Sequence, residues 1–257
     1  MPIHFAVAGH VARVTIDRPD VLNAIDAGAE RELNAVWTRI EADGGIRAVV
    51  LTGAGDRAFS AGADMKGGGA SGLEYWAAPR PGGFGGIALR TTLDVPVIAR
   101  VNGHALGGGL EMALGCDLII AAEEATFGLP EARVGRLPLD GGMVLLQRQI
   151  SSRHAMGMLL TGRRISAAEA LRFGLVNAVV PRAELNAEVE RWLADILACA
   201  PLSLRAIKQV ARRTAHLTAQ EAQAQRLPAL VEALASQDSC EGVKAFLEKR
   251  KPLWTGR

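Results

Sequence analysis

Apolar positions in the first 180 residues fall alternately into short β-type runs and helical stripes. Residues 11–17 predict a strand, which Arg18-Pro19 interrupts. Asp26 is placed to cap the helix that follows, which we expect to end near Ala42. The β-branched run 47–52 completes a strand–helix–strand unit, which favours parallel pairing of its strands. The predicted helix buries one apolar face with i, i+3, i+4, i+7 spacing: Leu33, Val36, Trp37 and Ile40.

The order strand, turn, helix recurs further along the chain. Residues 95–101 predict a buried strand, the glycines at 107–109 a turn and residues 110–114 a helix. Ser166 and Glu169 have the spacing of a capping box, and Gly174 is placed to end that helix. Further strands are predicted at 117–122, 125–128 and 175–180. This alternation predicts an α/β fold.

No strand is predicted beyond Pro181. Helices are predicted over 184–200, 202–215, 218–236 and 241–249, with Pro228 kinking the third. We therefore expect an α/β domain over residues 1–200 and a helical region over 201–257. The apolar faces of these helices must cover the core or another subunit.

Composition and charge exclude several classes of protein. The chain has 257 residues, 49% of them hydrophobic, and its 29 basic and 27 acidic residues give a net charge of +2, so no nucleic-acid partner is expected. The apolar window 95–122 is interrupted by charged residues and glycines, so we expect no membrane span. Three cysteines without a C-x-x-C pair, and no secretory signal, predict a cytoplasmic protein. The five histidines lack metal-ligand spacing, so no metal is expected.

Three segments are candidates for chemistry. The glycines at 107–109 precede a helix whose first N–H groups lack acceptors, so an oxyanion could bind there. Glu111 lies among apolar helical residues, which places it either at an exposed edge or in a buried polar site. The loop 60–66 and Glu131, just after Pro130, complete the set. Taken singly, each segment is as readily explained by an ordinary loop or helix surface.

Taken together and in this order, the segments resemble the crotonase superfamily, the enoyl-CoA hydratase and isomerase family. The resemblance covers essentially the whole chain and implies an α/β spiral of strand–strand–helix units. It also implies that the C-terminal helices assemble a homo-trimer or a dimer of trimers. It is carried by residues 60–66, 96–111, 116–117, 127–131, 161–167 and 246–250.

The resemblance implies an enoyl-CoA hydratase, a hydro-lyase that reversibly adds water to the 2,3 double bond of a 2-enoyl-CoA thioester. In the family, backbone N–H groups at the positions of Ala63 and Gly108 form an oxyanion hole, and each donor lowers the barrier by about 3 kcal/mol. Glu111 would hold and activate water, while Glu131 would handle the proton at Cα.

Coenzyme A then enters as the carrier of the acyl-CoA substrate, and no permanently bound cofactor is expected. The resemblance places Ala63, Asp64, Met65 and Lys66 around the adenine end of coenzyme A. Lys249 would approach its phosphate from a neighbouring subunit.

Several alternatives stay open. Residues 81–86, 162–164 and 251–257 look most like carnitinyl-CoA dehydratases, so crotonobetainyl-CoA is an alternative substrate. An enoyl-CoA isomerase and an acyl-CoA-binding pseudo-enzyme are further alternatives. Asp140 departs from the Pro-Gly-Ala-Gly-Gly loop of many hydratases and adds a third carboxylate. It could determine specificity by binding a cationic acyl group, perturb the protonation of the glutamates, or cap a helix that starts at Gly141.

Overall fold

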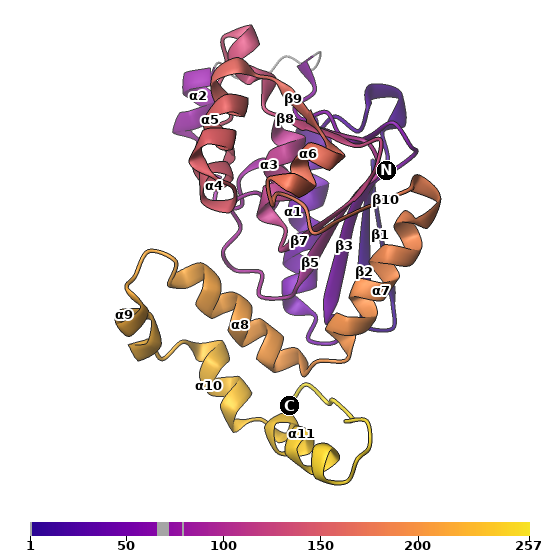
Figure 1. The fold of residues 1–257 in the computed structure, drawn as a ribbon, viewed down its shortest axis with the longest axis vertical. Helices are drawn as coiled ribbons and strands as arrows, with labels where there is room; N and C mark the ends of the chain where they lie inside the picture. Colours follow the sequence, from indigo (N-terminus) through magenta and orange to yellow (C-terminus); the bar gives the residue numbers. More distant parts are fainter. Residues whose placement is uncertain (1, 66–71, 79) are drawn as a thin grey trace.

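A computed structural model describes residues 2–65, 72–78 and 80–257. Its larger sheet has six strands in the order β1-β2-β3-β5-β7-β10 (Figure 1). All its pairs beyond β1·β2 are parallel, as the strand–helix–strand pattern predicts. The strands are Ile3–Ala8 (β1), Val11–Ile16 (β2), Ala48–Gly53 (β3), Val97–Val101 (β5), Leu118–Ala122 (β7) and Ala178–Val180 (β10).

The antiparallel strand β1 has no counterpart in the sequence prediction. It forms a hairpin with β2 at the edge of the sheet, and Ile3 is its one fully buried residue. Ile3, Phe5 and Val7 alternate along the strand, but Ala6 and Ala8 between them and the exposure of most of its residues weaken the contrast between its two faces.

A smaller sheet of four short strands lies beside the first, in the order β4-β6-β8-β9. Three of its strands directly follow strands of the large sheet, and each such pair leads into a helix. The chain thus repeats a strand–strand–helix unit. The strands are Ala58–Ser60 (β4), His104–Leu106 (β6), Thr126–Gly128 (β8) and Arg164–Ser166 (β9), and the helices after the first three are Gly72–Ala77 (α2), Gly108–Gly115 (α3) and Gly142–Gln149 (α4).

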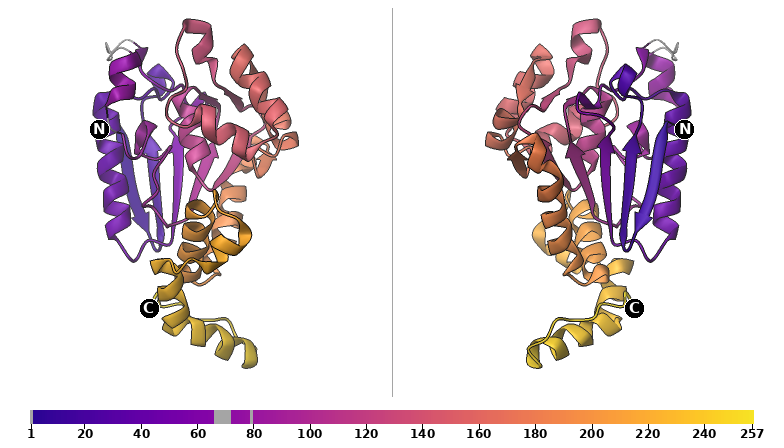
Figure 2. Two further views of the ribbon diagram at one scale, coloured as in Figure 1. Left: turned by 90° about the vertical axis from the view of Figure 1, so that its left-hand side faces the viewer. Right: turned by 90° about the vertical axis from the view of Figure 1, so that its right-hand side faces the viewer.

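The two faces of the large sheet pack against different helices. Val49 and Leu51 point into the main core with helix α1 (Ala27–Ala42), whereas Val50 packs against helix α7 (Leu185–Leu197). Figure 2 shows α1 along one side of the sheet. Asp26 caps α1 by accepting from Ala29 N at 2.8 Å, which confirms the predicted start of the helix.

Helix α6 (Ala167–Arg172) confirms the predicted capping box. The Ser166 hydroxyl accepts from Glu169 N, and the Glu169 carboxylate accepts from Ser166 N. Gly174, with φ +76°, follows the end of the helix as predicted. Helix α5 (Ser152–Thr161) has no counterpart among the predicted helices; it packs between α4 and the segment 130–134.

The last four helices extend from one end of the α/β part (Figure 1). They are Pro201–Arg213 (α8), Ala219–Ala224 (α9), Pro228–Ala235 (α10) and Gln237–Leu247 (α11). The prediction of one helix kinked at Pro228 is wrong, because α9 ends at Ala224 and Pro228 opens α10 at its first turn. Proline lacks an N–H group and holds the preceding residue, Leu227, in an extended conformation.

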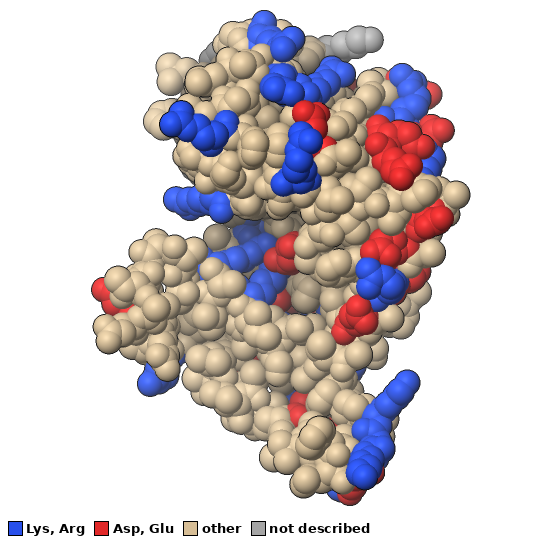
Figure 3. Space-filling view, viewed as in Figure 1, with Lys and Arg blue, Asp and Glu red and all other residues tan. Residues whose placement is uncertain are grey.

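Helix α8 is fastened to the α/β part by charged groups. The buried Lys208 ammonium donates to Asp117 Oδ2 at 2.6 Å and to Val95 O at 2.5 Å. Arg212 donates to the other oxygen of Asp117, at 3.0 Å. Figure 3 shows basic and acidic side chains together in the hollow between α8 and the α/β part. Burial lowers the pKa of Lys208 to about 8 despite its partner Asp117.

Two kinds of feature are absent from residues 2–65, 72–78 and 80–257. None of these helices is both long and apolar enough to cross a membrane. Nor do these residues bring three or more His, Cys, Asp or Glu side chains together as a candidate metal-binding group.

Candidate active site

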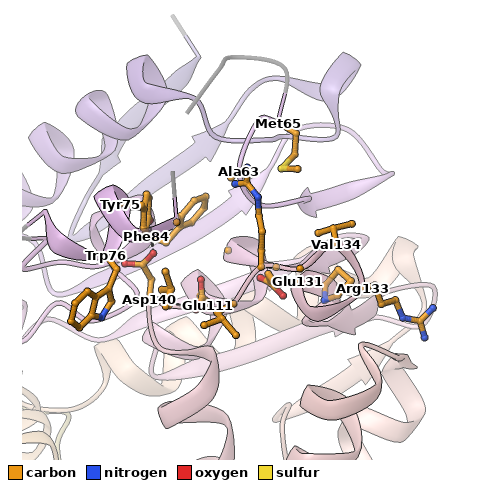
Figure 4. Close-up of a pocket in the computed structure, with 18 of the residues that line it drawn as sticks. Ala63, Met65, Tyr75, Trp76, Phe84, Glu111, Glu131, Arg133, Val134 and Asp140 are labelled. Atoms are coloured by element: carbon orange, nitrogen blue, oxygen red, sulfur yellow. Dashed lines mark hydrogen bonds between the residues drawn. The ribbon is translucent and has the colours of Figure 1, made fainter. Parts of the chain in front are cut away.

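A cavity of about 990 Å³ lies between α2, the start of α3 and the segments around residues 130–140. Figure 4 shows aromatic side chains at one end, with Glu111 and Glu131 further along. The cavity brings together six of the residues predicted from the sequence: Ala63, Met65, Gly108, Glu111, Glu131 and Asp140.

Glu111 occupies the first turns of α3 and is 3% exposed, which decides between the two placements open from the sequence. Its Oε1 accepts from Asp140 N at 2.9 Å and from Gly142 N at 2.8 Å. Burial raises the pKa of Glu111 to about 8, and the charges of Asp140 and Glu131 add to this effect. The two N–H groups oppose the shift without cancelling it. The surroundings of Glu111 therefore favour its protonated form.

Glu131 follows β8 in a short 3₁₀ turn over Pro130–Val134. Its carboxylate lies against Gly107, where an added Cβ would come within 3.0 Å of Glu131 Oε1. Its buried Oε2 has no hydrogen-bond partner within the described part of the chain. Burial also raises the pKa of Glu131. An unpartnered buried carboxylate oxygen is costly, and a bound ligand could satisfy it.

The backbone around Ala63 and Gly108 offers donors to the cavity. Counting only described residues as acceptors, neither N–H has one. Gly107, at the cap position before α3, has φ +56° and ψ −131°, which side-chain-bearing residues rarely adopt. At Gly108 an added Cβ would meet the Phe84 ring at 2.6 Å. The glycines predicted to bring a ligand close to bare backbone are thus also required by conformation and packing.

Asp140 lines the cavity and is 6% exposed. Helix α4 has Gly141 at its cap position and receives no side-chain cap, so the interpretation of Asp140 as a helix cap is wrong. The Asp140 carboxylate instead accepts a short hydrogen bond from the Tyr75 hydroxyl on α2. Burial raises the pKa of Asp140, while this hydrogen bond and the charge of Arg80 oppose the rise.

Of the other predicted binding residues, two lie away from the cavity and one is not described. Asp64 does not line the cavity; it pairs with Arg18 at 3.2 Å. Lys66 lies outside the described residues. Lys249 follows α11, at the opposite end of this chain from α2 (Figure 1).

Sequence reasoning missed several cavity residues. Tyr75 and Trp76 come from α2, and Phe84 from a glycine-rich loop. Arg133 and Arg136 line the cavity from the segment after Glu131. The only local signal is the abundance of glycine between residues 53 and 86, which is typical of a functional loop. Nothing in the sequence places Tyr75 beside Asp140, 65 positions away.

The arrangement defines a class of acid–base site. A buried and a half-buried carboxyl group, both with a raised pKa, share an apolar cavity with two backbone N–H donors. Such a site can move protons at neighbouring carbon atoms while it stabilises negative charge on a carbonyl oxygen.

Comparison with known proteins agrees with this class. Residues 7–257 match the model of the family described as enoyl-CoA hydratase/isomerase. The chain is 40% identical to carnitinyl-CoA dehydratase of Escherichia coli K12, over 99% of this chain and 98% of that protein. The crystal structure of enoyl-CoA hydratase from Bacillus anthracis aligns with a TM-score of 0.91 and 33% identity, covering 100% of both chains. That of enoyl-CoA hydratase from Mycobacterium tuberculosis H37Rv gives 0.90 and 31%, covering 100% of this chain and 99% of the other.

The chain therefore belongs to the enoyl-CoA hydratase/isomerase family. The crotonase-like fold and the enzyme class predicted from the sequence are both confirmed. A coenzyme A thioester as substrate is consistent with this family.

Proposed function

We propose that this enzyme reversibly adds water to the 2,3 double bond of a 2-enoyl-CoA thioester. One observation carries the proposal: Glu111 and Glu131, both with a raised pKa, share a cavity with the N–H groups of Ala63 and Gly108, which have no acceptor among the described residues. A single carboxyl group would suffice to shift a double bond. Two groups support hydration, in which one must act on water and the other on carbon.

The charges in the cavity favour a working state with one proton on the glutamate pair. Glu111, Glu131 and Asp140 are all partly or fully buried, and mutual repulsion opposes ionisation of all three. The pair then offers one carboxylate to accept a proton from water and one carboxylic acid to donate a proton to carbon. Its titration belongs to the pair rather than to either residue alone.

In the proposed hydration step, the proton of the pair lies on Glu131 once substrate is bound. Glu111, then the carboxylate, accepts a proton from water as the water oxygen bonds to Cβ. The electrons of the double bond move through Cα onto the thioester oxygen, giving an enolate. The N–H groups of Ala63 and Gly108 stabilise this enolate, each by about 3 kcal/mol. Glu131 donates its proton to Cα as the carbonyl re-forms. The sum is one water added, and dehydration follows the same path in reverse.

Coenzyme A is proposed as the substrate's carrier and not as a resident cofactor. Arg133 and Arg136 supply positive charge at the cavity, where a phosphate of coenzyme A could pair with them. Ala63 and Met65 line the same cavity and support the predicted contact with the adenine end. The proposal also includes contacts of Asp64 and Lys66 with the adenine end of coenzyme A. It further includes an approach of Lys249 from a neighbouring subunit to the phosphate of coenzyme A.

The test is turnover of crotonyl-CoA in ¹⁸O-labelled water, followed by mass spectrometry. We expect label in the hydrated product, and we expect Glu111→Gln and Glu131→Gln each to lower turnover by roughly 10²–10⁴-fold. The matched control is Glu190→Gln, which alters an exposed carboxylate paired with Arg13 outside the cavity.

Wild-type turnover in both cavity variants would overturn the assignment of the pair. A double bond that moves without uptake of label would indicate an isomerase. Retention of acyl-CoA without turnover would indicate a binding protein.

A cationic acyl group, as in crotonobetainyl-CoA, is the second candidate substrate. It is favoured by the Asp140 carboxylate beside Tyr75, Trp76 and Phe84 at one end of the cavity (Figure 4). A carboxylate among aromatic rings suits a quaternary ammonium group. The relatives named carnitinyl-CoA dehydratase agree with it. Label entering only the crotonobetainyl product would favour this candidate over a general hydratase.

We further propose a homo-trimer or a dimer of trimers in the cytoplasm, with a division near residue 200 between catalytic and helical parts. Exposed apolar side chains on the last helices support assembly through this region, among them Leu234, Val243, Phe246 and Leu247.

A further inference from the structure

A continuous series of polar contacts links helix α1 to Glu111. Glu30 on α1 pairs with Arg80 at 2.6 Å. The Arg80 guanidinium carbon lies 3.9 Å from the centre of the Tyr75 ring. The Tyr75 hydroxyl donates to the Asp140 carboxylate, and the Asp140 N–H donates to Glu111 Oε1. The series thus connects four segments distant in sequence and ends at one carboxyl group of the proposed pair.

Tyr75 is the residue of this series that lines the aromatic end of the cavity. It belongs to α2, whose other described side chains are exposed. Its ring is held by Arg80 and its hydroxyl by Asp140, so one residue fixes α2 relative to both α1 and the loop before α4. Figure 4 shows Tyr75 and Asp140 side by side at the aromatic end of the cavity.

Asp140 has two separate roles in the geometry. Its main chain helps to orient Glu111, because its N–H is one of the two donors to Oε1. Its side chain binds Tyr75. A shift of α2 that pulls on the Asp140 side chain would therefore also displace the backbone that holds Glu111.

We propose that Tyr75 and Asp140 are positioning residues, which fasten α2 across the aromatic end of the cavity and hold Glu111 in its working orientation. The proposal rests on the proposed hydratase function. It concerns how Glu111 is held and leaves open which acyl group is bound.

The same contacts act on protonation. Glu111 faces Asp140 and Glu131, and the negative charge of each favours its protonated form. Asp140 in turn faces Tyr75 and Arg80, and both favour its ionised form. Removing the Tyr75 hydroxyl lets Asp140 take up a proton more readily, and this weakens its effect on Glu111. Changes at either residue should therefore move the titration of Glu111 in the same direction.

The test uses Tyr75→Phe and Asp140→Asn in the full-length enzyme with crotonyl-CoA. The first keeps the ring and deletes the hydrogen bond, whereas the second keeps the backbone donor and deletes the charge. We expect kcat to fall about tenfold or more in each. We also expect the limb of the pH–rate profile that reports the titration of Glu111 to move to lower pH in both variants. The double variant should lose little beyond the worse single variant, because both changes break one contact.

The matched controls are Thr92→Val and Glu41→Gln. They break a similar hydroxyl–carboxylate hydrogen bond, Thr92 to Glu41 at 2.5 Å, which lies outside the cavity. We expect both controls to keep the wild-type kcat and pH limb. Unchanged kcat and an unchanged pH limb in Tyr75→Phe and Asp140→Asn would overturn the proposal.

Failure of this proposal is distinguishable from failure of the proposed function. If Glu111→Gln is inactive while the Tyr75 and Asp140 variants behave as wild type, the hydratase assignment stands and the positioning role is lost. If Glu111→Gln itself retains wild-type turnover, both fail.

Discussion

At the scale of single residues, Glu111 shows how burial changes the chemistry of an ordinary side chain. An exposed glutamate ionises near pH 4.5, yet burial in α3 beside Asp140 and Glu131 raises the pKa of Glu111 to about 8. In the absence of substrate the fold therefore favours the protonated form of this carboxyl group. Its cost is instability, because unfolding releases a carboxyl group that prefers to ionise in water.

This cost predicts the pH dependence of stability. Between about pH 4.5 and 8 the folded state binds the Glu111 proton and the unfolded state does not, so the free energy of unfolding falls as pH rises, by at most about 1.4 kcal/mol per pH unit. Glu111→Gln should remove the part of this fall that comes from Glu111, because an amide does not titrate. The variant should still fold, since its amide oxygen can accept from Asp140 N and Gly142 N.

Urea unfolding of both proteins at pH 5, 6, 7 and 8 measures the difference. The difference in the free energy of unfolding between the variant and wild type should shift in favour of the variant with each increase in pH. Parallel curves for the two proteins would contradict the raised pKa.

At the scale of elements, local signals were reliable where one segment contains both partners of a contact. Asp26 and Ser166 cap α1 and α6 through hydrogen bonds three residues away, and both caps could be predicted from the sequence. The strands β4, β6 and β9 have no predicted counterpart, because three residues show little alternation and their pairing partners lie 20 or more residues away; the equally short β8 and β10 lie within longer predicted apolar runs.

The two helix starts at Ser151 and Ser166 give a matched prediction. Ser166→Ala should lower the free energy of unfolding by about 1 kcal/mol, because it removes the cap of α6. Ser151→Ala should change it far less, since Ser151 precedes α5 without a side-chain cap bond. Urea denaturation of the two variants side by side measures both, and equal losses would contradict the role assigned to the capping box.

At the scale of the whole molecule, the C-terminal helices leave a large apolar surface in water. Phe246 is 82% exposed and Leu247 74%, whereas the core beneath α8 and α10 is a small cluster around Leu202, Ala206 and Ala229. Exposed apolar surface on this scale marks an interaction site. The predicted trimer or dimer of trimers would cover it.

Phe246→Asp should therefore weaken assembly. Sedimentation at micromolar concentration should give three or six times the chain mass for wild type and a smaller species for the variant. Val7→Asp, which places the same charge at an exposed apolar position on β1, should assemble as wild type. A monomeric wild-type protein would contradict the predicted assembly.

The sequence by itself determined the alternation of strands and helices, the caps of α1 and α6 and the candidate residues of the site, because these depend on spacing within short segments. The resemblance to a family supplied the pairing of Glu111 with Glu131 and the roles of Ala63 and Gly108. Only the tertiary structure decided that Glu111 is buried, that Asp140 binds Tyr75 instead of capping α4, and that Pro228 starts a helix. The first two outcomes depend on contacts between segments distant in the chain, and local patterns carry no information about such contacts.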